Sequence, residues 1–219
     1  MLKINLTELP KDQFYSEVCN KTQIVLHHTV SDPESAIGDV GSWKADSARI
    51  ATYAIISADG TINKCFPSNN WAHHIGLKAE TLKEAGFEDY ATRNTLLNQH
   101  SIAIELDCWG GLVEKGGKLL NAYGKPINPK LPVVKCDWRG FTHFQAYTDA
   151  QIQTLSELLP ILMKANKIQK YGIMDGNFDV RKDAMQGVSG IFSHSSFRAD
   201  KSDLYPDSRL ISMLKNLNV

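Results

Sequence analysis

The chain has 219 residues, 42% of them hydrophobic, and its 24 basic and 24 acidic residues give a formal net charge of zero. This length suits one large domain or two small ones, and the balanced charge gives no electrostatic argument for a nucleic acid or another polyanionic partner. No run of about 18 apolar residues occurs, so we expect no insertion into a membrane.

The N-terminal residues 1–21 are expected to be a polar lead-in. Residues 1–11 lack the basic start and the apolar centre of a secretory signal, so we expect a protein that is made in the cytoplasm without an export signal. The four cysteines form no CxxC pair. The missing signal favours free thiols, with a bridge between Cys108 and Cys136 as the alternative.

The first predicted strand covers residues 22–26, a β-branched and aliphatic run that continues into His27, His28 and Thr29. A buried strand with this ending delivers its last side chains to a site. Because adjacent strand residues face opposite sides of a sheet, we expect His28 to be a packing or supporting residue rather than a ligand.

A loop and a β-hairpin are predicted next. Residues 32–47 are rich in Gly, Ser, Asp and Pro, which is typical of a loop. Residues 50–57 and 61–66 are predicted strands, and the Ala-Asp-Gly sequence at 58–60 is typical of the turn between them. A short helix is expected over 78–86.

Residues 101–106 alternate apolar and small side chains around Glu105 and predict a central strand. A lone carboxylate in such a strand favours a catalytic role, because burying it unpaired is costly. Between residues 107 and 145 this pattern disappears, so we expect an insertion of hairpins or loops.

The clearest predicted helix begins after Thr148, which forms a capping box with Gln151. Apolar residues recur at helical spacing over 152–162, so one face is expected to pack on a core. Pro160 is expected to kink or restart this helix. Asp207 is a candidate cap for a last helix.

One late polar loop contains His194, Lys201 and Asp203. Zinc in hydrolases binds imidazole nitrogen and carboxylate oxygen, commonly from three protein ligands, and leaves a fourth position for water. With His27 at a strand end, these residues provide a two-histidine, one-carboxylate site. Glu105 is then an additional carboxylate able to act as a base.

The order of strands and helices along the chain is mixed, and no repeat or low-complexity linker divides it. This pattern predicts an α/β fold, a single domain over residues 1–219 with a central mixed β-sheet flanked by helices.

Six segments in this order resemble the N-acetylmuramoyl-L-alanine amidases of the peptidoglycan-recognition and phage-lysozyme superfamily, the type 2 zinc amidases. Together they extend over about residues 22 to 207, most of the chain. The segments are 24–29, 59–62, 71–76, 101–106, 147–151 and 193–203.

The resemblance implies one zinc ion per chain, held by His27, His194 and Asp203. It implies Glu105 as the general base, because it matches the glutamate of the family's Ser-Ile-Gly-Ile-Glu strand, and Lys201 as the group that stabilises the oxyanion. The implied reaction hydrolyses the amide bond between N-acetylmuramic acid and L-alanine.

Candidate substrate-binding residues are His74, Trp71 and Tyr53. His74 matches the family's Trp-His-Ala-Gly segment, and a substrate-groove role and a structural hydrogen bond both remain open for it. The tryptophans either line a sugar groove or fill the core. The catalytic tyrosine of some family branches is absent at Thr52-Tyr53, which favours Glu105 as the base.

The resemblance implies a hydrolase acting on peptidoglycan or muropeptides, and the expected role is that of an endolysin-like, bacteriolytic enzyme that reaches the cell wall after release from the cytoplasm. Two alternatives stay open. One is a cytosolic amidase that recycles muropeptides, and the other is a peptidoglycan-binding module that has lost catalysis. The three filled ligand positions favour the enzyme.

Overall fold

The computed structural model describes residues 1–45 and 48–218. Six strands form its main sheet, and its strand order is β1-β4-β3-β5-β2-β10. The neighbours pair in parallel except for the β3–β4 hairpin, which is antiparallel. These strands are β1 (Ile4–Leu6), β2 (Gln23–His28), β3 (Ala54–Ile56), β4 (Ile62–Lys64), β5 (Ser101–Leu106) and β10 (Gly190–Ser193).

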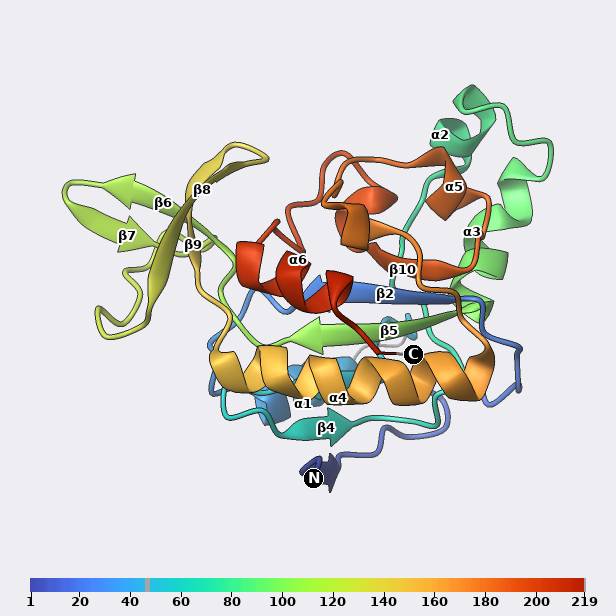
Figure 1. The fold of residues 1–219 in the computed structure, drawn as a ribbon, viewed down its shortest axis with the longest axis horizontal. Helices are drawn as coiled ribbons and strands as arrows, with labels where there is room; N and C mark the ends of the chain where they lie inside the picture. The colour runs from blue at the N-terminus through green and yellow to red at the C-terminus, as the bar shows by residue number, and fades with distance from the viewer. Residues whose placement is uncertain (46–47, 219) are drawn as a thin grey trace.

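Helices flank this sheet, and α4 and α6 cross its near face in Figure 1. The predicted α/β fold, with a central mixed sheet flanked by helices, is confirmed. The helices are α1 (Ala36–Ala45), α2 (Ala79–Glu84), α3 (Tyr90–Gln99), α4 (Asp149–Asn166), α5 (Lys182–Met185) and α6 (Ser208–Lys215), with 3-10 turns η1 (Ile173–Asp175) and η2 (His194–Ser196).

Three parallel strands, β10, β2 and β5, bring their carboxyl ends to one edge of the sheet. Ser193 pairs with Leu26, so His194 follows beside His27. His27 in turn pairs with Glu105 on β5. The register therefore places three side chains from distant parts of the chain next to one another, because neighbouring strands lie about 4.8 Å apart.

The two faces of the sheet contribute to different cores. Ile24 and Leu26 belong to the main core together with Leu155 of α4. Val25 points the other way and belongs to a second cluster with Leu97 of α3. By the same alternation, His27 lies on the face of Val25 and His28 on the face that α4 covers.

The capping box at the start of α4 is present as predicted. The Thr148 hydroxyl accepts from the Gln151 backbone N–H, and the Gln151 side chain accepts from the Thr148 N–H. Pro160 lies inside the helix without ending it. The Gln151 Nε2 also donates to the carbonyls of Ile56 and Asp107, which anchors the helix on the sheet.

The predicted loop over 32–47 was wrong for most of its length, because α1 occupies it; residues 46–47 lie outside the described residues. Gly38 and Gly41 lower helix propensity by roughly 1 kcal/mol each relative to alanine. Val40 on the same helix is 1% exposed. Packing of this face outweighs the weak local preference.

The N-terminal residues 1–21, expected as a lead-in, contribute the edge strand β1, in which Ile4 pairs with Ile62 of β4. The strand is short and exposed, so its sequence has no buried pattern by which to recognise it. The helix α3 also lacked a sequence signal, since only Leu97 and Asn98 of its residues are buried.

Residues 107–145, predicted to form hairpins or loops, build a second, antiparallel sheet with the order β7-β6-β9-β8. Figure 1 shows it projecting from one side of the main sheet. Its strands are β6 (Gly111–Lys115), β7 (Lys118–Leu120), β8 (Val133–Trp138) and β9 (Phe141–Gln145).

All four cysteines are free thiols, and the alternative bridge between Cys108 and Cys136 is not formed. Among the described residues, none of the helices has both the length and the apolar character that crossing a bilayer requires.

Candidate active site

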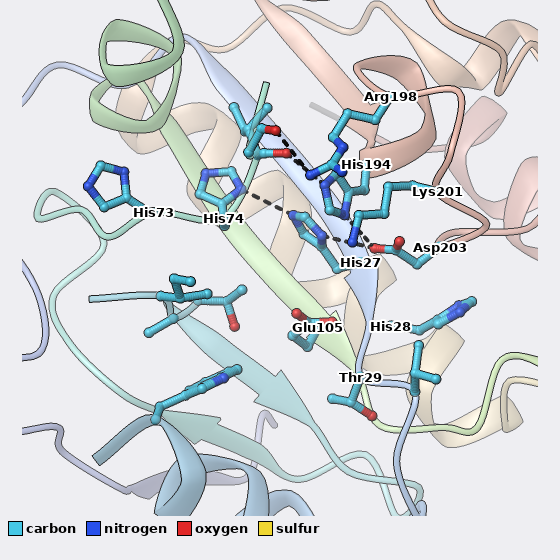
Figure 2. A pocket seen from close by; sticks show the side chains of 17 residues that line it. His27, His28, Thr29, His73, His74, Glu105, His194, Arg198, Lys201 and Asp203 are labelled. Atoms are coloured by element: carbon cyan, nitrogen blue, oxygen red, sulfur yellow. Dashed lines mark hydrogen bonds and ion pairs between the residues drawn. The ribbon is translucent and has the colours of Figure 1, made fainter. Parts of the chain in front are cut away.

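A cavity of about 350 Å³ opens at the carboxyl ends of β2 and β5. The five residues that the sequence singled out for metal binding and catalysis all line it (Figure 2): His27, Glu105, His194, Lys201 and Asp203. The strands hold His27 and Glu105, and the loop after β10 contributes the other three.

Two imidazoles and one carboxylate converge at the wall of this cavity. The Nδ1 atoms of His27 and His194 lie 3.1 and 2.9 Å from the same oxygen, Oδ2 of Asp203. One ligand atom from each residue lies within 4.8 Å of the other two, and all three residues are buried. Two ligands bound tetrahedrally to zinc at about 2.0–2.1 Å lie about 3.3 Å apart, so this donor set fits a zinc ion.

The protonation state of His27 also fits a metal. Burial, together with the neighbouring His194 ring, lowers the pKa of His27 to about 4. At neutral pH His27 is therefore uncharged, which is the form of an imidazole that binds metal.

Glu105 lies beside His27 on the neighbouring strand, and its Oε2 is buried without a hydrogen-bond partner among the described residues. Burial, followed by the nearby carboxylate of Asp203, raises the pKa of Glu105 well above its usual value, and Lys201 acts in the opposite direction. An unpaired carboxyl group that faces a cavity is available to exchange a proton with a bound molecule.

Sequence reasoning did not single out Arg198, which also lines the cavity. Its Nη1 donates to the Gly76 carbonyl over 3.0 Å, and Asp200 accepts from its Nε and Nη2. Gly76 has φ +67°, and a Cβ there would lie 2.6 Å from the guanidinium. The position of Arg198 in the same late loop as His194 was the available signal.

Residues 19–206 match the family model of the N-acetylmuramoyl-L-alanine amidases. The chain belongs to this amidase family. No curated protein matches the sequence.

Several solved structures have the same fold, and one of them is an amidase. The N-acetylmuramoyl-L-alanine amidase LysC from Clostridium intestinale URNW is 16% identical with a TM-score of 0.50, and the match covers 98% of this chain and 99% of that one. The Staphylococcus aureus hydrolase AmiA, solved with its ligand, is 10% identical with a TM-score of 0.51 over 98% of this chain and 81% of that one. PlyL is 13% identical with a TM-score of 0.51, covering 100% of this chain and 99% of that one. At these identities the comparison concerns the fold alone.

In this amidase, His74 also lines the cavity and contacts a candidate ligand directly. Its Nδ1 lies 3.1 Å from Nε2 of His27, and its Nε2 lies 2.8 Å from the Ser101 hydroxyl (Figure 2 shows the first contact). His28, by contrast, bonds through Nδ1 to the Tyr147 hydroxyl at 2.9 Å and takes no part in the convergence on Asp203.

The other two candidate substrate-binding residues do not line this cavity. Trp71 stacks on Tyr15 with 3.8 Å between ring centroids, and its Nε1 donates to Glu17. Tyr53 is 8% exposed and belongs to the main core. Trp43 lines the cavity instead.

Proposed function

We propose that this amidase is zinc-dependent and hydrolyses the amide bond between N-acetylmuramic acid and L-alanine in peptidoglycan, as a wall-lytic enzyme. The observation that carries the proposal is the convergence of His27, His194 and Asp203 beside an unpaired Glu105 in a chain of this family.

His27, His194 and Asp203 are the proposed zinc ligands. A zinc ion held by them would supply Lewis acidity to the substrate carbonyl and would lower the pKa of a bound water to about 7. The three side chains offer two imidazole nitrogens and one carboxylate oxygen, the donor types that zinc takes in hydrolases.

Glu105 is the proposed general base. Its carboxylate takes a proton from the attacking water and then gives it to the amine of the departing L-alanine. The group must be ionised to begin this cycle, and positive charge in the cavity favours its ionised form. Lys201 supplies part of that charge, since it lowers the pKa of Glu105.

Lys201 has a second proposed role, which is to stabilise the negative charge that develops on the carbonyl oxygen. Its ammonium lines the same cavity as the three ligands. In other hydrolases, a single contact of this kind is worth roughly 3 to 4 kcal/mol in the transition state.

The test is mass spectrometry of the products released from purified peptidoglycan, with and without a chelator. We expect free stem peptides that begin with L-alanine, lost on chelation and restored by zinc. Glu105→Gln is expected to reduce their rate of release by about 100- to 10,000-fold. Glu114→Gln, which changes an exposed glutamate of β6, is the matched control and is expected to have no effect.

The substrate range separates the alternatives. Release from polymeric peptidoglycan supports the wall-lytic enzyme, whereas activity on soluble muropeptides alone identifies a recycling amidase. Binding to the wall without amide cleavage at any zinc concentration would reject the enzyme and favour a recognition module.

A further inference from the structure

One short segment, His74-Ile75, contacts both histidines of the proposed zinc site. The ring of His74 contacts Nε2 of His27 at 3.1 Å, and the carbonyl of Ile75 accepts from Nε2 of His194 at 2.9 Å. Asn98 of α3 fixes this segment, because its Oδ1 accepts from both backbone N–H groups at 2.8 and 3.1 Å. The segment therefore acts on both rings at the nitrogen that faces away from Asp203.

The contacts of His27 continue through a chain of hydrogen bonds that ends at a backbone carbonyl. Nε2 of His74 contacts the Ser101 hydroxyl at 2.8 Å, and that hydroxyl donates to the Leu97 carbonyl at 2.7 Å. The carbonyl only accepts, so the single proton of Ser101 is committed to it. The contact between His74 and Ser101 then requires a proton on Nε2 of His74.

The same assignment of protons applies to the next two rings toward the cavity, those of His74 and His27. A neutral imidazole has one N–H, so His74 with a proton on Nε2 offers Nδ1 as an acceptor to His27. His27 must then hold its own proton on Nε2, and its Nδ1 faces Asp203 with a free lone pair.

His194 reaches the same state by a shorter route. Its Nε2 donates to the Ile75 carbonyl, so a ring with a single N–H presents an unprotonated Nδ1 to Asp203. The two contacts with Oδ2 of Asp203 are therefore the two that lack a proton. They are the contacts where a bound cation satisfies all three ligand atoms.

We propose that Ser101 and His74 are positioning residues that hold His27 with its proton on Nε2 and its Nδ1 free to bind zinc. We call the chain of hydrogen bonds from Ser101 through His74 to His27 the relay. The Ser101 hydroxyl determines which nitrogen of His74 holds the proton, and His74 in turn determines which nitrogen of His27 holds it. Partners of this kind orient metal ligands and typically change metal affinity or activity by about 10- to 100-fold when removed. The inference rests on the proposed zinc site.

The experiment combines zinc affinity with direct observation of the histidine rings. Metal-free protein is titrated with zinc against a chelator of known affinity, and long-range proton–nitrogen NMR spectra of histidine-labelled protein identify the protonated nitrogen of each ring. In the wild-type protein we expect His74 and His27 to be protonated on Nε2 when zinc is bound, and His74 to be so in the metal-free protein as well. Ser101→Ala is expected to weaken zinc binding by about 10- to 100-fold and to shift part of the His74 population to protonation on Nδ1.

Two further variants separate positioning from general stability. Ser101→Thr retains the hydroxyl and is expected to retain the affinity and the ring signals. Thr154→Val removes another buried hydroxyl, on α4, which donates to the Gly60 carbonyl at 2.8 Å. This variant is expected to change neither the zinc affinity nor the ring signals.

A wild-type His74 protonated on Nδ1 overturns the relay, as does a Ser101→Ala protein that binds zinc within twofold of the wild type. Weaker binding without any change in the His74 ring assigns Ser101 a structural role and also overturns it. Absence of zinc binding in the wild type rejects the proposed function instead, and the ring spectra of the metal-free proteins still decide the direction of the relay.

Discussion

Replacing Asp107 by asparagine is expected to remove a strong pH dependence from the stability of the fold. Asp107 is 1% exposed and lies just after β5, where the hydroxyls of Thr29 and Ser31 donate to its Oδ1. Its Oδ2 has no hydrogen-bond partner among the described residues. Burial, followed by the Asp39 carboxylate, raises the pKa of Asp107 from 3.8 to about 7.

Whether stability rises or falls with pH depends on which state, folded or unfolded, holds the Asp107 proton more tightly. Between about pH 4 and pH 7 the unfolded chain loses this proton while the folded protein keeps it, so the free energy of unfolding falls as the pH rises. A change of one in the pKa corresponds to about 1.4 kcal/mol, so a difference of about 3 lowers the free energy of unfolding by about 4 kcal/mol at pH 7 and above. Asparagine presents an N–H group in place of the unpaired oxygen and does not titrate.

The assay is urea unfolding of the wild-type protein and Asp107→Asn between pH 4 and 8. We expect the variant to gain stability relative to the wild type as the pH rises, with the full difference reached near pH 7. Asp137→Asn, at an exposed position of β8, is the control and should follow the wild type. Parallel curves for the wild type and Asp107→Asn across this range would refute the argument.

Three other outcomes are expected. Adding zinc at 100 times its dissociation constant should raise the free energy of unfolding by about 2.7 kcal/mol, seen as a higher melting temperature that Asp203→Ala no longer shows. Asn98→Ala leaves the backbone N–H groups of residues 74 and 75 without their acceptor and is expected to lower the free energy of unfolding by about 2 to 4 kcal/mol in urea titrations. A change below roughly 0.5 kcal/mol, the effect of an ordinary surface substitution, would contradict its anchoring role. Leu155→Ala, on the buried face of α4, is expected to cost about 2 to 5 kcal/mol by the same assay while the variant still binds zinc, and loss of zinc binding in a folded variant would show that the site depends on this core.

The elements with a clear local signal were predictable from the sequence. The strand that ends in His27, the Glu105 strand, the hairpin and the capped helix α4 each have an apolar period, a turn or a cap that depends on neighbouring residues only. The helix α1 was missed because its stability comes from packing rather than from its glycine-containing sequence.

The candidate site divides in the same way. Two histidines, a lysine and two carboxylates at strand ends and in one polar loop led to the proposed chemistry, because burying such side chains without partners is costly. Trp71 and Tyr53 were candidates from sequence, yet they pack away from the cavity, and Arg198 and Trp43 line it. Which aromatic side chain reaches a cavity depends on contacts between distant segments.

The sequence by itself determined the family, the sheet-and-helix composition and the five side chains that are proposed as ligands or catalytic groups. Only the tertiary structure decided how they meet, because the register of β10, β2 and β5 sets His194, His27 and Glu105 side by side. The tertiary structure also joined Ser101 to His27 through His74. The hydrogen bond between His27 and His74 spans 47 positions of the sequence, and the one between His74 and Ser101 spans 27. Such long-range contacts leave no periodic trace along the chain.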